Sequence, residues 1–195
     1  MLSNQIIKLD SIGSTNDYLK ELAINGCTDG TAVIARFQNN GRGSYGKSFD
    51  SPSGGLYMSY YKHLDTLTDD LCLITQWTAV SVYNAIWEYC KIQCQIKYIN
   101  DLLYDGKKLC GILTEISDKN LIIGIGINTN TKMEDLDPHI RANAISLKSI
   151  IGGTVDNDIL SGLIISKLNQ QFYDWPDKKW RKEFYDKNVI MNQKK

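Results

Sequence analysis

The segment from Gly41 to Ser48, GRGSYGKS, combines residue types that bind anions, because its glycines expose backbone amides while Arg42 and Lys47 add positive charge. It satisfies both the dinucleotide pattern G-x-G-x-x-G and the NTPase pattern G-x-x-x-x-G-K-S. Both patterns need a helix that begins at the loop, since its first turn supplies amides and a dipole to the phosphates. Pro52 and two glycines follow closely and disfavour that helix. The segment therefore predicts a loop that binds an anionic ligand and belongs to neither class.

The spacing of apolar residues predicts the strands and helices that must position this loop. Asp105-Gly106, between two apolar runs, is a strong hairpin signal. The loop over residues 39–55 is long for a compact domain, which is typical of functional loops. The other predicted elements are strands at 6–10, 31–38, 56–62 and 120–130, and helices at 14–26, 69–89, 146–151 and 157–175.

The order of these elements predicts an α+β fold. Strands come in hairpin-linked runs with helices between them, which does not match the regular strand–helix alternation of a parallel sheet. We expect a mixed, mainly antiparallel β-sheet with helices packed largely on one face. The chain of 195 residues suits one such domain.

Composition argues against several classes of function. The 22 Lys and Arg and 22 Asp and Glu residues are spread along the chain, so we expect binding to neither nucleic acid nor a membrane. Five cysteines without a C-x-x-C pair indicate neither a disulfide framework nor a zinc site, and two distant histidines argue against a His-based triad. The sequence shows no signal-peptide pattern and no apolar run of about 18 residues, so we expect a cytoplasmic location.

Four blocks of sequence, taken together, resemble the biotin protein ligases. They are STN from Ser14, QNNGRGSYGKSFDSPSGGLYMS from Gln38, KYINDLLYDGKKLCGILTE from Lys97 and GIGINTN from Gly124. The family pattern has Ser-Thr-Asn before the first helix, Gly-Arg-Gly-Arg-x-Gly-Arg-x-Trp in the loop, Lys-Trp-Pro-Asn-Asp-Leu with Lys-x-x-Gly-Ile-Leu, and Gly-x-Gly-Ile-Asn. Agreement in order and spacing over four blocks is far more specific than one glycine motif.

The resemblance implies a catalytic domain of this family over residues 1–180. Residues 181–195 would be a short C-terminal tail, either a remnant of the small β-barrel domain that relatives carry or a truncation before it. Ser14 lies close to Met1, so we expect no winged-helix DNA-binding domain ahead of the catalytic block. A ligase without a repressor function is the implied protein.

The implied reaction joins biotin to ATP to form biotinyl-5'-AMP and then transfers biotin to a lysine of a biotin carboxyl carrier protein. ATP and Mg2+ would be required, with biotin as the substrate. Two alternatives stay open: a ligase for another carboxylate such as lipoate, and a non-catalytic protein that binds biotin or biotinyl-adenylate. Family members often pair through sheet edges, and the sequence neither supports nor excludes a homodimer.

The resemblance also assigns roles to individual residues. Lys108 would lie at the bond between the biotin carboxyl group and the phosphate, Arg42 would hold the carboxylate end, and Asp101 would accept a proton or contact Mg2+. These three are the catalytic candidates. Biotin would be bound by Ser14, Thr15, Asn16, Gln38, Gly41, Arg42, Gly43, Ser44, Lys108 and Gly111. ATP or the adenylate would be bound by Lys47, Phe49, Lys97, Asn100 and Asn128, and Gly111 and Gly126 would keep the strands close to the ligand.

Some of these residues also have structural interpretations. In isolation, Lys108 could be a solvated hairpin lysine, Asn100 a turn residue and Asn128 a cap at the end of a strand. The chain also departs from the family pattern: Ser44 and Lys47 replace two loop arginines, Phe49 replaces the tryptophan, and Tyr98-Ile99 replaces Trp-Pro. Because serine lacks the charge and reach of arginine, we expect Ser44 to weaken retention of the adenylate.

Overall fold

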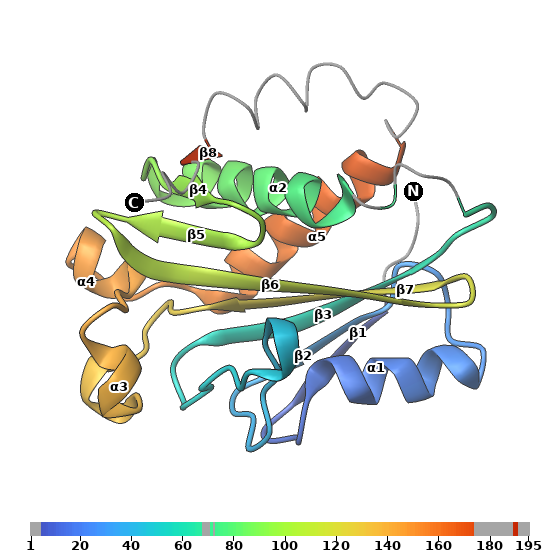
Figure 1. Cartoon of the computed structure of the whole chain (residues 1–195), viewed down its shortest axis with the longest axis horizontal. Coiled ribbons are helices and arrows are strands. Elements are labelled where there is room, and N and C mark those ends of the chain that lie inside the picture. Colours follow the sequence, from blue (N-terminus) through green and yellow to red (C-terminus); the bar gives the residue numbers. More distant parts are fainter. Residues whose placement is uncertain (1–4, 68–70, 72, 174–188, 191–195) are drawn as a thin grey trace.

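The computed structural model describes residues 5–67, 71, 73–173 and 189–190. Its centre is an eight-stranded mixed sheet with the order β1-β2-β3-β7-β6-β5-β4-β8 (Figure 1). The outer pairs β1–β2 and β4–β8 are parallel, and every other neighbouring pair is antiparallel. The strands are β1 (Ile6–Leu9), β2 (Ala32–Ala35), β3 (Leu56–His63), β4 (Gln95–Lys97), β5 (Asp101–Tyr104), β6 (Lys107–Ser117), β7 (Asn120–Ile127) and β8 (Val189–Ile190).

Helices cover the two faces of this sheet unequally. The two longest, α2 (Ile74–Cys90) and α5 (Asn157–Tyr173), pack against each other on one face, while α1 (Thr15–Ile24) lies on the opposite face (Figure 1). The short helices α3 (Pro138–Arg141) and α4 (Leu147–Ile151) lie beyond the end of β7. The prediction of a mixed, mainly antiparallel sheet is confirmed. Helices were expected largely on one face, and the two longest lie there, whereas α1 lies on the other face.

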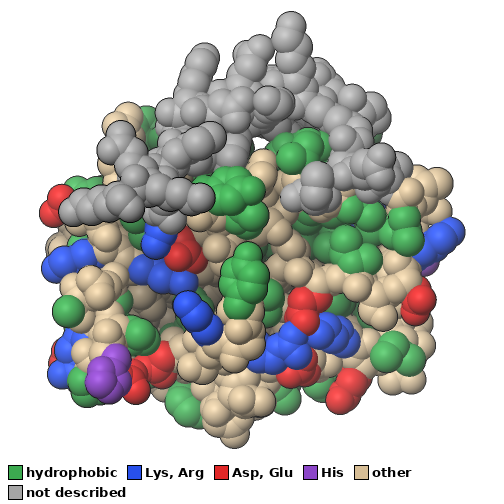
Figure 2. Space-filling view, in the orientation of Figure 1, with side chains coloured by type: hydrophobic (Ala, Val, Ile, Leu, Met, Phe, Trp, Pro, Cys, Tyr) green, Lys and Arg blue, Asp and Glu red, His purple; other side chains and the backbone are tan. Residues whose placement is uncertain are grey.

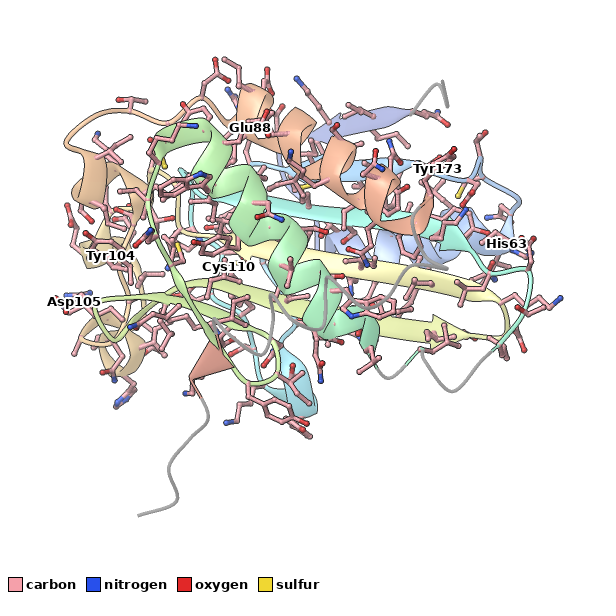
Figure 3. The ribbon with its side chains drawn as sticks, turned by 90° about the horizontal axis from the view of Figure 1, so that it is seen from above. His63, Glu88, Tyr104, Asp105, Cys110 and Tyr173 are labelled. Atoms are coloured by element: carbon pink, nitrogen blue, oxygen red, sulfur yellow. The ribbon has the colours of Figure 1, made fainter. Side chains whose placement is uncertain are left out.

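The alternation of side chains along the strands divides the core into two parts. On β3, Met58 and Tyr60 join the large cluster beneath α2 and α5, whereas Tyr61 joins a small cluster with Leu19 and Ala23 of α1. Figure 3 shows α2 lying across the sheet, with Glu88 near its C-terminal end beside α5. There Glu88 Oε2 forms an ion pair with Lys167 Nζ of α5 at 2.5 Å. On the other face of the sheet, α1 is too short to cover all of the strands. The candidate site lies on the part of that sheet face that α1 leaves uncovered.

Most of the helices and strands were predicted from short-range sequence patterns. Asp105 and Gly106 both have positive φ, as a two-residue hairpin turn between β5 and β6 requires, and Asp105 lies at the outer tip of that hairpin (Figure 3). The predicted strand at 31–38 is shorter than expected, because β2 ends at Ala35. The sequence reading missed α3 and β4. The predicted tail at 181–195 lies outside the described residues except for β8.

Other expectations concern the surface and the cysteines. The described cysteines are all free: Cys94 and Cys110 are buried, while Cys27 and Cys90 are half-buried. His63 and His139 are exposed, as expected. No helix among the described residues has the length and apolar character that crossing a bilayer needs.

Candidate active site

Three glycines form a flat floor on the α1 face of strands β6 and β7. Gly111 pairs with Gly126 across the two strands, and Gly124 pairs with Leu113. A Cβ added to Gly126 would lie 2.5 Å from a ring atom of Phe49, and one added to Gly124 would lie 2.3 Å from Asn16 Oδ1. The missing side chains therefore let Phe49 and Asn16 lie directly on the sheet.

A first pocket opens between this floor, the start of α1 and the glycine-rich loop. Its empty volume is about 440 Å³. It is lined by Ser14, Thr15, Asn16, Gln38, Arg42, Gly43, Ser44, Phe49, Met58, Asn100, Lys108, Gly111, Ile112, Leu113, Gly124, Ile125 and Gly126. The structure thus brings together nine of the ten residues that the sequence assigns to biotin. The tenth, Gly41, is buried at the start of the loop, where an added Cβ would be 2.3 Å from the carbonyl oxygen of Phe49.

Polar groups at the start of α1 are bonded to one another. Ser14 caps the helix and accepts a hydrogen bond from the amide of Asp17. Gln38 Oε1 accepts from the Thr15 backbone amide at 2.8 Å and from Thr15 Oγ1 at 3.0 Å. Ser59, which the sequence reading did not single out, places its Oγ 2.8 Å from Thr15 Oγ1. These buried groups are arranged to exchange internal hydrogen bonds for those of a polar ligand.

The glycine-rich loop folds back on itself as a tight turn over the pocket. The Gly43 amide donates to the Lys47 carbonyl at 2.7 Å, and the Phe49 amide donates to the Gly41 carbonyl at 2.8 Å. Its only helical segment is the 3-10 turn Ser44–Gly46. As expected, no helix begins at Lys47, so the NTPase and dinucleotide patterns are accidental matches. Ser44 Oγ accepts from Asn100 Nδ2 at 2.9 Å, which joins the loop to the segment before β5.

Arg42 lines the first pocket, but its guanidinium donates to the protein's own carboxylates. Arg42 Nη1 donates to Asp17 Oδ1 at 2.8 Å, and Arg42 Nη2 donates to Glu115 Oε1. Glu115 Oε1 also accepts from Lys20 Nζ at 2.7 Å. Figure 2 shows basic and acidic side chains side by side at the start of α1. The sequence reading missed Asp17, Lys20 and Glu115, although Glu115 lies inside one of the blocks that it used and Asp17 directly follows another.

The pKa of Glu115 reflects this crowding. Burial acts to raise the pKa of the Glu115 carboxyl, but hydrogen bonds from Lys20 and Asn16 and the charges of Lys20 and Arg42 bring it below its ordinary value. Glu115 is therefore ionised at neutral pH, as its cationic partners require.

Lys108 occupies the other side of the first pocket. Its Nζ lies 2.8 Å from Asp101 Oδ1 and 5.6 Å from the centroid of the Phe49 ring. The backbone of Lys108 is fixed as well, because its amide donates to Asn143 and its carbonyl accepts from the amide of Ile145. The residue therefore presents one ammonium group from a rigid backbone.

A second pocket adjoins the first, with an empty volume of about 640 Å³. It is lined by Ser48, Phe49, Asp50, Lys108, Asn128, Leu136, His139, Ile140, Asn143 and Ala144. Phe49 and Lys108 belong to both pockets, so the ring and the ammonium stand at their junction. Asn128 lies in the second pocket and Asn100 in the first, so the two residues predicted to read adenine are not brought together.

Two predicted ATP contacts lie outside both pockets. Lys47 is exposed on the outer side of the loop, and Lys97 lies on β4, paired in register with Asp101. Just after Lys97, the peptide bond between Tyr98 and Ile99 is cis. Among the described residues, no group of three or more His, Cys, Asp or Glu side chains could hold a metal ion.

The mixed sheet therefore carries two adjoining pockets that share Phe49 and Lys108. Residues 9–130 match the model of the "Biotin/lipoate A/B protein ligase family". That match covers more than half of the chain, and the chain belongs to this family.

Curated relatives agree with this family. The chain is 35% identical over 181 residues to "Bifunctional ligase/repressor BirA" of Bacillus subtilis (strain 168), a match that covers 90% of the chain and 56% of the relative. It is 25% identical over 169 residues to "Biotin--[acetyl-CoA-carboxylase] ligase" of Mycobacterium tuberculosis, covering 84% of the chain and 62% of the relative. The chain thus spans little more than half the length of these relatives.

Solved structures agree as well. The Aquifex aeolicus biotin protein ligase in complex with biotin and ATP has a TM-score of 0.81 at 30% identity, over 89% of this chain and 72% of that one. The Leishmania major ligase in complex with biotinyl-5-AMP has a TM-score of 0.80 at 23% identity, over 95% of this chain and 81% of that one, which shows a shared fold.

Proposed function

We propose that this chain activates biotin with ATP to give biotinyl-5'-AMP and transfers biotin to a lysine of a biotin carboxyl carrier protein. The observation that carries the proposal is the junction at Lys108, where a polar pocket and a more apolar one share a cation. The first pocket would hold biotin, and the second would hold the adenosine end of ATP. The Aquifex aeolicus ligase in complex with biotin and ATP and the Leishmania major ligase in complex with biotinyl-5-AMP support this choice of ligands.

The first step brings two anions together at the junction. A biotin carboxylate oxygen attacks the α-phosphorus of ATP, the bond to pyrophosphate breaks, and pyrophosphate leaves with the electron pair. Lys108 Nζ is placed to neutralise charge that develops on the carboxylate and the phosphate, and a fixed cation in a partly dry site is an efficient stabiliser. Phe49, which already lies on the glycine floor, would form a wall beside the nucleotide.

The second step needs a neutral amine from the carrier. A free lysine has a pKa of about 10.4, so it must lose a proton before its nitrogen attacks the biotinyl carbonyl carbon and AMP leaves. Asp101 lines neither pocket, but its Oδ1 lies 2.8 Å from Lys108 Nζ, which lines both. We assign Asp101 the role of accepting that proton or of contacting the metal.

Mg2+ would fit this site only as an ion held mainly by the triphosphate. Asp101 offers a single carboxylate, and the described residues contain no cluster that could form a complete cage. Mg2+ commonly binds through one or two carboxylates together with substrate phosphates. When bound, the ion would neutralise phosphate charge, and Asp101 is the residue that would contact it.

The polar groups around α1 suit the ureido ring of biotin. Ser14, Thr15 and Gln38 lie close together and present both donors and acceptors. Asn16 is held more firmly, because its Nδ2 donates to the charged Glu115 Oε2 at 2.8 Å and its Oδ1 lies 2.5 Å from Ser59 Oγ, whereas the side chains of Thr15 and Gln38 bond only to neutral groups. We therefore assign ring binding to Ser14, Thr15 and Gln38, with Asn16 fixing the wall behind them.

The test is to mix the purified chain with a biotin carrier domain, biotin, ATP and Mg2+ and to measure the carrier mass. The proposal predicts a gain of one biotinyl group that requires ATP. Labelling by lipoate in place of biotin would contradict it and favour a ligase for another carboxylate. Biotin binding by calorimetry without any labelling of the carrier would contradict it too, in favour of a non-catalytic binding protein.

A further inference from the structure

Arg42 is the only guanidinium in the glycine-rich loop, and both of its terminal nitrogens donate to carboxylates of the protein. Nη1 donates to Asp17 on α1, and Nη2 donates to Glu115 on β6. A planar guanidinium that bridges two carboxylates is held in one orientation, which a lysine could not reproduce. The loop is thereby fastened at one point to a helix and to a central strand.

Glu115 is the centre of this arrangement. Its Oε1 accepts from Lys20 and Arg42, and its Oε2 accepts from Asn16 Nδ2. Only 23% of the Glu115 side chain is exposed, against 43% for Asp17. Glu115 thus joins three elements that the sequence separates widely: the start of α1, the loop and β6.

The charges within this cluster balance. Arg42 and Lys20 carry two positive charges, and Asp17 and Glu115 carry two negative ones, so the cluster has no net charge with which to attract an anion. The Lys108–Asp101 pair is neutral as well, but the Lys108 ammonium makes one ion pair where the Arg42 guanidinium makes two, and Lys108 lines both pockets. The geometry therefore favours Lys108 over Arg42 as the cation that faces the reacting groups.

We propose that Glu115 is a positioning residue that holds Arg42, and through it the glycine-rich loop, over the first pocket before any substrate binds. Arg42 then acts as a fastening for the loop. Glycines make such a loop costly to order, so a loop that is already fixed spares the ligand part of that ordering. Of the two tests described below, only the kinetic one rests on the proposed function, and the hydrogen-exchange one does not.

The direct test is hydrogen exchange of the full chain without ligands. Glu115→Gln removes the negative charge while keeping the shape of the side chain. Exchange in a peptide over residues 41–49, which contains the Gly43 and Phe49 amides, should become about tenfold faster, the effect expected from losing a charge-assisted hydrogen bond. Asp17→Asn should act in the same direction but less strongly, because Asp17 is more exposed.

Glu88→Gln is the matched control. Glu88 forms a comparable ion pair with Lys167 between α2 and α5, on the opposite face of the sheet. Its loss should leave exchange over residues 41–49 unchanged. If Glu115→Gln and Glu115→Ala both leave loop exchange at the wild-type rate, the inference is overturned. Faster exchange spread equally over β3 and β7 would also overturn it, because Glu115 would then support the whole fold.

The kinetic arm separates positioning from catalysis. When the competent loop position is only partly populated, the apparent affinity for a ligand falls by that fraction. Glu115→Gln should therefore raise the KM for biotin several-fold while kcat stays within about twofold of the wild type. A fall in kcat at unchanged KM would contradict a positioning role. If the wild-type chain shows no biotin-dependent reaction at all, the proposed function fails while the exchange result still decides the role of Glu115.

Discussion

Arg42 and Lys108 both place a positive charge beside the first pocket, but the protein holds them in different ways. Arg42 extends from a glycine-rich loop and is bonded to carboxylates of α1 and β6. Lys108 extends from a rigid strand and pairs with Asp101 alone, beside the ring of Phe49. The loop carries the side chain with two carboxylate partners, and the strand carries the side chain with one. The comparison teaches that a cationic side chain in a binding motif, such as Arg42, can hold its loop in place instead of contacting the ligand.

The largest expected effect separates Lys108 from its neighbour in the same hairpin. Lys108→Ala should lower biotin transfer to a carrier domain by about a hundredfold or more, as loss of one fixed donor at a developing charge does in other enzymes. Lys107→Ala should leave transfer unchanged, because Lys107 is exposed. Mass-spectrometric labelling rates measure both. Equal labelling rates for Lys108→Ala and the wild type would show that Lys108 takes no part in the reaction at the junction of the two pockets.

The next effect concerns Ser44, which lines the first pocket together with the two cations. Ser44 Oγ holds only Asn100 Nδ2, and serine has neither the charge nor the reach to fasten the loop over an adenylate. We expect wild type to label a bystander protein without a carrier motif, and Ser44→Arg to label it about tenfold less. A blot for biotin after incubation with biotin and ATP measures this. Undetectable labelling by both would show that the loop retains the adenylate without an arginine.

A smaller effect tests the floor beneath Phe49. Gly126→Ala would place a Cβ 2.5 Å from the Phe49 ring, so the ring must move and the KM for ATP should rise several-fold. Gly162→Ala is the control, because nothing lies within 4 Å of an added Cβ on this exposed helical glycine. That control should raise the free energy of unfolding by about 0.5–1 kcal/mol in urea titrations. An unchanged KM in Gly126→Ala would show that Phe49 does not form the nucleotide wall.

The smallest effect is the pH dependence of the Arg42 cluster. Folding lowers the pKa of Glu115 from its ordinary value of 4.5, so its stabilising contribution is present above that value and is lost as pH falls through the lower folded pKa. The groups that face it are Lys20, Arg42 and Asn16, with Asp17 beyond Arg42. The wild type should exceed Glu115→Gln in free energy of unfolding by about 1 kcal/mol at neutral pH. This difference, measured in urea titrations, should shrink as the pH is lowered below 4.5; a constant difference would contradict the assigned ionisation.

Structural features that depend on residues close together in the sequence could be predicted. The Asp105-Gly106 turn, the helix predicted at 14–26 and the glycine-rich loop are local signals, and the four blocks contain most of the residues that line the first pocket. Contacts across long separations could not be predicted this way: Arg42 meets Glu115 across 73 residues, and Asn16 meets it across 99. Helix α3 did have a signal, since Asp137 caps it and proline follows, but it is only four residues long.

The most direct test of the division between the two cations is the rate of biotin-dependent pyrophosphate release as biotin is varied. In Arg42→Ala, the loop loses its fastening, so the KM for biotin should rise about tenfold or more while kcat falls at most a few-fold. In Lys108→Ala, kcat at saturating biotin should fall by about a hundredfold. If Arg42→Ala instead lost kcat as severely as Lys108→Ala, with little change in KM, Arg42 would act on the reacting groups and the account would be wrong.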